Sequence, residues 1–263
     1  MTIVYGVLVV CAVNAAAVAG LALVQRLVSL ELREQHNDVA GFVYAVLGVV
    51  YAVLLALVVI AVWEQYQRAR ETVGSEANAV AEIAWLAHRL PESDRQQLQE
   101  HARSYAQEVV NEEWPLMEQG MEQKGRGTPR GWDLIDDIRA TLQEVDPATE
   151  AEQALHAQGL NQVQRLADAR RMRLVQAEQG MPAVLWAVLV FGGVVAVGFA
   201  YLFGLQNIWA HRLMVVSLAS VIALVLFTIG VIEHPFSGGA RIDTEAFELV
   251  LERFETSRLS DLR

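Results

Sequence analysis

The sequence contains one cysteine, one lysine and no long stretch that alternates apolar and polar residues. Because Cys11 is alone and lies within an apolar run, an internal disulfide is excluded, and nothing indicates an oxidising compartment. The six histidines form neither a His-Glu-x-x-His motif nor a Cys/His pattern with ligand spacing, and the carboxylates form no recognisable catalytic pair. We therefore expect no metal, no cofactor, no nucleic-acid partner and no enzymatic activity.

Charge is also absent from the whole stretch between Asp38 and Glu64. That run is longer than the roughly 20 residues that a helix needs to cross about 30 Å of hydrocarbon. Three further apolar runs, at 3–24, 183–203 and 213–232, bring the predicted number of membrane spans to four. The first run has no Lys or Arg before Gln25, so it lacks the charged start of a signal peptide, and we expect it to be a retained span.

The charged residues gather between residues 64 and 179 and after residue 232, which indicates a polar part separate from the spans. Residues 64–90 contain no proline and keep a helical period of apolar residues, so the second span is expected to continue as one helix of about 50 residues, roughly 75 Å long. Further helices are predicted at 91–113, 132–145, 149–178 and 240–253, and residues 124–131 are predicted to form a surface turn.

The predicted fold is therefore all-α, with four transmembrane helices and an α-helical bundle between spans 2 and 3. The expected division is 1–63 for the first two spans, 64–181 for the helical domain, 182–234 for the last two spans, and 235–263 for a C-terminal turn and amphipathic helix. Either the helical domain buries its own core, or neighbouring subunits complete its thin, alanine-rich faces.

The placement of arginine predicts the orientation, because positive charge near the membrane ends favours the cytoplasmic side. The side of the helical domain has seven such residues: Arg68, Arg70, Arg165, Arg170, Arg171, Arg173 and Arg241. The opposite side has Arg26, Arg33 and Arg212. We expect the helical domain and both termini in the cytoplasm. Nineteen arginines against one lysine hint at a GC-rich bacterial genome. The expected location is the bacterial cytoplasmic (inner) membrane, which the chain crosses several times.

Two stripes follow the second span. Small residues, which let helix backbones approach closely in lipid, are predicted to form a packing face of Gly41, Ala45, Gly48 and Ala52. A neighbouring bulky stripe consists of Phe42, Val46, Val49, Val50, Val53 and Leu57. The bulky stripe could face lipid, a partner helix or the axis of an oligomer, where it would form a hydrophobic constriction.

Polar residues at the two ends of this span are predicted to form the polar mouth of a pore, if the span lines one. Asn37 and Asp38 precede the apolar run and Glu64 follows it. Asp38 could act as a helix N-cap at the interface, as a functional charge, or as both. Beyond the span, Glu71 and Glu76 are expected to lie on a solvated helix face, although they would line a pore if that face enclosed one.

Several motifs resemble those of the uncharacterised bestrophin-like family of bacterial membrane proteins, and the likeness covers nearly the whole chain. They are Asn37-Asp38, Trp63-Glu64-Gln65-Tyr66, Glu113-Trp114-Pro115, Pro182 with Trp186, Leu202-Phe203-Gly204 and Pro235-Phe236-Ser237-Gly238. The turn made by Pro235, Phe236 and Gly238, with the acidic residues and Phe247-Glu248 after it, resembles the bestrophin motif in which Asn-Pro-Phe-Gly leads into an acidic run.

A distant resemblance to bestrophin anion channels implies a pentamer whose second helices line a pore with an apolar neck, extended by a helical cytosolic portion. The dense acidic run that binds Ca²⁺ in animal bestrophins is reduced here to Asp243 and Glu245, so calcium gating is not expected. The net charge of −11 falls on the predicted cytoplasmic side, which leaves the sign of the permeant ion open.

Two functions from different classes fit these observations. The first is a homo-oligomeric ion channel in the lipid bilayer that conducts an inorganic ion past the bulky stripe. The alternative is a non-conducting membrane-anchored protein whose acidic helical domain docks a cytoplasmic partner.

Overall fold

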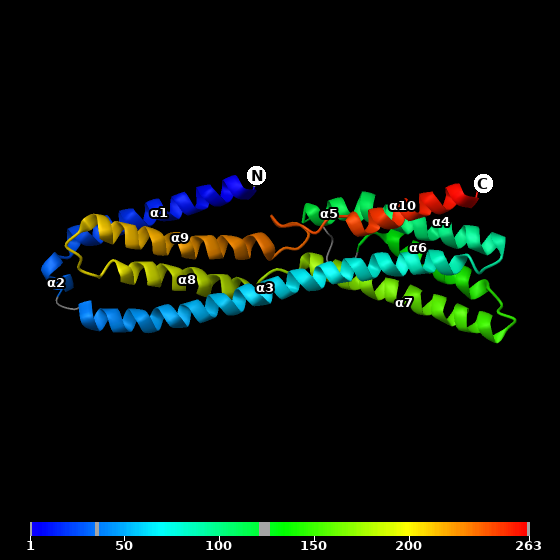
Figure 1. Ribbon diagram of the computed structural model, residues 1–263, viewed down its shortest axis with the longest axis horizontal. Coiled ribbons are helices and arrows are strands. Elements are labelled where there is room, and N and C mark those ends of the chain that lie inside the picture. The colour runs from blue at the N-terminus through cyan, green and yellow to red at the C-terminus, as the bar shows by residue number, and fades with distance from the viewer. Residues whose placement is uncertain (1, 35–36, 121–126, 262–263) are drawn as a thin grey trace. The chain divides into compact units, whose positions relative to one another are not determined.

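The computed structural model describes residues 2–34, 37–120 and 127–261, and these residues form ten α-helices, one π-helical turn and no strand (Figure 1). The helices are α1 (Thr2–Leu27), α2 (Leu30–Glu34), α3 (Asn37–Ala87), α4 (Glu92–Glu108), η1 (Val109–Glu113), α5 (Trp114–Glu118), α6 (Pro129–Glu144), α7 (Glu150–Glu178), α8 (Ala183–Ala200), α9 (Ile208–Ile232) and α10 (Glu245–Asp261). The predicted all-α fold is confirmed.

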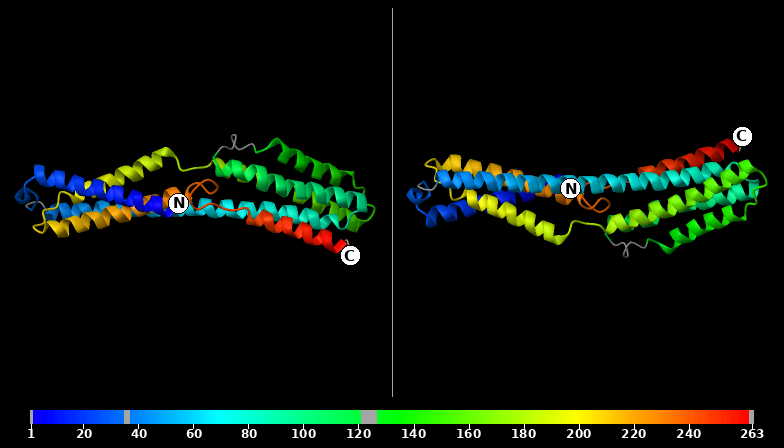
Figure 2. Two further views of the ribbon diagram at one scale, coloured as in Figure 1. Left: turned by 90° about the horizontal axis from the view of Figure 1, so that it is seen from above. Right: turned by 90° about the horizontal axis from the view of Figure 1, so that it is seen from below.

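The chain divides into two compact units. The membrane unit comprises residues 1–64 and 180–233, and the polar unit comprises residues 65–179 and 234–263. Helix α3 contributes to both, and the two views of Figure 2 show it as one unbroken helix. Its 51 residues correspond to about 75 Å of helix.

Four helices of the described residues are long and apolar enough to cross a membrane, as predicted: α1, α3, α8 and α9. The span boundaries differ from the prediction by a few residues. Helix α9 begins at Ile208, five residues before the predicted start at Leu213, because the Asn207 side chain accepts hydrogen bonds from the backbone N–H groups of Trp209 and Ala210 and caps the helix there.

Glycines allow the helices of the membrane unit to approach each other. The Tyr51 ring of α3 lies against Gly192 and Gly193 of α8, and its hydroxyl donates to the Leu189 carbonyl oxygen at 2.8 Å. Between α1 and α9, Gly6 leaves room for the ring of Phe227. Lipid gives apolar helices little hydrophobic reason to associate, so close packing and hydrogen bonds of this kind hold the unit together.

The polar unit has a conventional buried core of aliphatic and aromatic side chains from α3, α4, α6, α7 and α10. A capping box starts α7, since the Thr149 side chain accepts from the backbone of Glu152 while the Glu152 carboxylate accepts from the backbone of Thr149. Thr128 caps α6, which therefore begins at Pro129, before the predicted start at Trp132. The rest of the predicted turn, residues 124–126, lies outside the described residues.

The helix predicted to stop at Trp114-Pro115 continues instead through η1 into α5. Pro115 has no N–H and cannot complete the α-helical bond to the Asn111 carbonyl. The Trp114 N–H bonds to the Val109 carbonyl oxygen, five residues back, so a π-helical turn absorbs the irregularity and the chain stays helical.

We predict that Gly192→Ala destabilises the membrane unit by about 1–3 kcal/mol, the usual cost of overpacking. A Cβ at Gly192 would lie 2.6 Å from the Tyr51 ring, which its hydrogen bond to Leu189 holds in place. Gly198→Ala on the same helix is the matched control, because a Cβ there meets nothing within 4 Å. Unfolding of the purified protein in SDS measures the free energy of unfolding of both variants. Equal stability of the two would contradict the prediction.

Candidate functional site

The membrane segment of α3 has three faces about 120° apart, taking 100° per residue along the helix. One of them packs inside the chain. Its residues contact α8 and α9, and they are Leu47, Tyr51, Leu54, Leu55, Val58 and Val62. Tyr51, Val58 and Val62 are buried. This face holds α3 against α8 and α9, and the other two faces have no neighbouring helix among the described residues.

The second face is the bulky stripe predicted from the sequence. Its members are between 52% and 74% exposed, and they are Phe42, Val46, Val49, Val50, Val53 and Leu57. Helix α3 thus presents a continuous apolar surface that no other part of the described chain covers. In a membrane such a surface meets either acyl chains or another protein chain.

The third face carries the four small residues. A Cβ placed on Gly41 or Gly48 would meet no atom within 4 Å, and Ala45 and Ala52 are exposed. Within the chain, close approach to α8 instead uses Gly192 and Gly193 opposite Tyr51. The small residues of α3 therefore make no close helix contact inside one chain, and their predicted packing role stays a prediction that requires a second chain.

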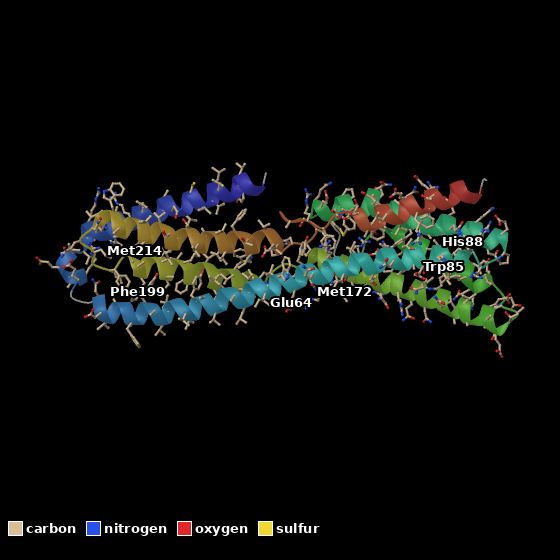
Figure 3. The ribbon with its side chains drawn as sticks, viewed as in Figure 1. Glu64, Trp85, His88, Met172, Phe199 and Met214 are labelled. Atoms are coloured by element: carbon tan, nitrogen blue, oxygen red, sulfur yellow. The ribbon has the colours of Figure 1, made fainter. Side chains whose placement is uncertain are left out.

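Of the three polar residues at the ends of the span, Asn37 is hydrogen-bonded to another segment, whereas Asp38 and Glu64 are exposed. The Asn37 side chain forms two hydrogen bonds with the backbone of Gly204: its Nδ2 donates to the carbonyl oxygen at 2.9 Å, and its Oδ1 accepts from the N–H at 3.0 Å. Asn37 thus pins the start of α3 to the segment between α8 and α9. Asp38 and Glu64 are exposed, and Figure 3 labels Glu64 on α3.

A buried ion-pair cluster lies inside the polar unit. It consists of Glu76 on α3, Glu113 on η1, and Arg170 and Arg173 on α7, all at most 1% exposed. Arg173 donates through Nε and Nη2 to the two carboxylate oxygens of Glu76, at 2.7 and 3.0 Å, and through Nη2 to Glu113 at 2.6 Å. Arg170 pairs with the other oxygen of Glu113. Two positive and two negative charges balance.

Neutral groups complete the cluster. The Tyr105 hydroxyl donates to Glu76 at 2.5 Å, and the backbone N–H of Thr128 donates to Glu113 at 2.9 Å. The Arg170 guanidinium stacks over the Trp132 ring, 4.5 Å from its centroid. Gly131 is required beside it, because a Cβ there would lie within 2.5 Å of the guanidinium. The cluster therefore joins α3, α4, η1, α6 and α7.

These contacts favour the charged forms of Glu113 and Arg173 and the neutral form of Tyr105. Burial alone would raise the pKa of Glu113, but the attraction of Arg173 and Arg170 outweighs it, so this pKa lies below its usual value. Burial would lower the pKa of Arg173, yet Glu76 and Glu113 raise it well above the ordinary range. Burial and the Glu76 charge raise the pKa of Tyr105, which remains a hydroxyl donor.

This cluster was not predicted from the sequence, and Glu76 was expected on a solvated helix face. That placement is wrong, since Glu76 is fully buried. The sequence did contain an indication that Glu76 is buried. It lies three residues after Val73 and four before Val80, on the apolar stripe of its own helix. Arg170 likewise follows Leu166 by four residues and precedes Leu174 by four.

The predicted turn at Pro235, Phe236 and Gly238 is a packing element of the polar unit. Phe236 is buried edge-on against the Trp114 ring, with the centroids 5.7 Å apart. Within the turn, the Gly238 N–H donates to the His234 carbonyl oxygen, and the Ile242 N–H donates to that of Pro235. The turn thereby anchors the chain ahead of α10.

These features define the class: a multi-pass all-α membrane protein with one long helix shared by a membrane unit and a polar unit. The chain belongs to the Bestrophin-like family, because the model of the Bestrophin-like domain matches residues 11–247. The resemblance predicted from the sequence motifs is therefore confirmed. With four helices long and apolar enough to span a bilayer, the chain is a membrane protein.

A solved structure supports the same fold. A mutant of a bacterial bestrophin homologue from Klebsiella pneumoniae is similar to this chain with a TM-score of 0.58 and 12% sequence identity. The similarity covers 81% of this chain and 84% of that one. Among curated proteins, the sequence has no match.

We predict that Glu113→Gln lowers the free energy of unfolding at pH 7 by about 3–5 kcal/mol, because it removes one charge from a buried set of ion pairs. The pKa of Glu113 is lowered on folding, so its stabilising contribution is complete above the unfolded value near 4.5 and is lost as pH falls through the folded value. The difference between wild type and variant should therefore shrink below about pH 4.5. Thermal unfolding followed by circular dichroism measures it.

Glu112→Gln is the matched control, since Glu112 is the exposed neighbour of Glu113 on the same turn. We expect that control to stay within about 0.5 kcal/mol of wild type. A Glu113→Gln variant as stable as the control at pH 7 would show that the buried ion pairs contribute no net stability.

Proposed function

We propose that the chain forms a homo-oligomeric ion channel in the bacterial inner membrane, in which α3 of each subunit lines the conduction path. The observation that supports this most directly is the bare bulky stripe of α3 between a packed face and a face of small residues. Membership of the Bestrophin-like family fits a channel.

The three-face arrangement of α3 suits a ring of subunits. With one face fixed on α8 and α9 of its own chain, the small-residue face can approach the next subunit closely. The bulky stripe, about 120° away, then points to the axis. Rings of Val and Leu side chains there would form a narrow apolar constriction, which gates by excluding water.

The polar unit is proposed to lie in the cytoplasm together with both termini, on the basis of the arginine distribution. Arg170 and Arg173 are buried in ion pairs and are better left out of that count. Arg68, Arg70, Arg165, Arg171 and Arg241 still outnumber the three arginines of the opposite side. The alternative remains a membrane-anchored protein whose polar unit docks a partner.

We predict that the detergent-solubilised chain is an oligomer, with a mass that is a multiple of 29.1 kDa. Gly48→Leu should dissociate it, because the added side chain blocks close approach of the small-residue face. Ala12→Leu, on an exposed position of α1, is the control and should leave the oligomer intact. Light scattering coupled to size exclusion measures the mass, and a monomeric wild-type chain would eliminate the channel.

We also predict that Val53→Ala raises single-channel conductance in planar bilayers, since it widens and wets an apolar constriction. Val194→Ala, which shortens another exposed valine, on α8, should leave conductance unchanged. If the two variants conduct alike, the bulky stripe does not line the path.

A further inference from the structure

The polar unit contains a cavity of about 990 Å³, within the size range of small-molecule sites, and it differs in charge from the rest of the molecule. Residues from the end of α3, from α4 and from α10 line it. Four arginines and two glutamates contribute to the lining, in a chain whose net charge is −11. The charged residues of the lining are thus positive on balance, opposite in sign to the chain as a whole.

The arginines are available to a ligand. Arg95 pairs with Glu92, and Arg103 has only a 3.9 Å approach to Glu255. Both glutamates are exposed, and exposed ion pairs of this kind are weak and exchange easily. Arg89 and Arg253 have no ion-pair partner among the described residues.

An aromatic and apolar floor accompanies the arginines. Trp85 lines the cavity with 51% of its surface exposed, which is unusual for the largest apolar side chain, and Val250 and Phe254 of α10 add to the floor. Figure 3 labels Trp85 and His88 near the end of α3. His88 also lines the cavity, with its Nδ1 within hydrogen-bond distance of the carbonyl oxygens of Ala84 and Trp85.

From this combination we propose that the cavity binds a small phosphorylated molecule that carries a flat ring. The guanidinium fork of arginine matches phosphate bidentately, and Arg89 and Arg253 are the side chains that hold the phosphate. The exposed Trp85 ring stacks on the flat part of the ligand. All the lining residues belong to the polar unit, so the proposal goes beyond conduction and holds whether or not the chain is a channel.

Titration calorimetry of the full chain in detergent tests the site with two probes, 1-naphthyl phosphate and inorganic phosphate. We expect the naphthyl compound to bind more tightly. Arg89→Gln and Arg253→Gln should each weaken both probes by roughly tenfold or more, the effect of losing one charge-assisted hydrogen bond. Trp85→Ala should weaken only the naphthyl compound and leave inorganic phosphate unchanged.

Arg139→Gln is the control, because Arg139 pairs with Asp136 on α6, away from the cavity. Circular dichroism and the oligomer mass of each variant are recorded alongside, so that misfolding is seen separately. The proposal is overturned if neither probe binds, or if binding survives in the Arg89 and Arg253 variants. It is also overturned if those variants change the oligomer mass while no probe binds wild type, since the cavity would then be a contact between subunits.

Discussion

Pairing of buried charge is the constraint on which the polar unit depends. Arg173 has no solvent around it, so its three guanidinium nitrogens must be satisfied by protein, and they reach Glu76, Glu113 and the Met117 sulfur. A charge left alone there would cost several kcal/mol. Arg173 pairs with both carboxylates and Glu113 with both arginines, so these pairs depend on the register of α3, η1 and α7. Aliphatic packing alone would tolerate sliding of these helices, whereas this ion-pair geometry does not.

Helix α3 is one continuous helix, but its apolar residues are buried in the polar unit and largely exposed in the membrane unit. In the polar unit its apolar residues Val80 and Ile83 are fully buried, as water requires. In the membrane unit Val49 and Val50 are 65% exposed, which lipid permits without cost. Packing in the membrane segment is decided by shape and hydrogen bonds, as at Tyr51, and the helix can therefore carry an apolar surface that no other part of its own chain covers.

The helices could be predicted well from the sequence, but the contacts between side chains could not. The four apolar helices, the continuous α3 and the family all followed from run length, periodicity and motifs. The ion-pair cluster did not, because Glu113 and Arg173 are 60 residues apart and only folding brings them together. Trp114-Pro115 was read as a helix stop because a local rule excludes proline from helices, and the π-helical turn that accommodates it depends on the packing of Trp114 against Phe236 and Phe247. Asn37 could be placed at the end of a span, but its bonds to Gly204 could not be read from a sequence separation of 167 residues.

The distribution of exposure on α3 argues for a second chain more strongly than its hydrophobicity does. A helix that only anchors a domain needs apolar residues in any order, because lipid accepts all of them alike. Here the small residues are collected on one face and the bulky ones on another, and neither face packs against another helix in the described part of the chain. Glycine and alanine on a lipid-facing surface gain nothing from close approach, and glycine lowers helix stability by about 1 kcal/mol relative to alanine. Gly41 and Gly48 have a physical reason to share that face only if another backbone comes near it.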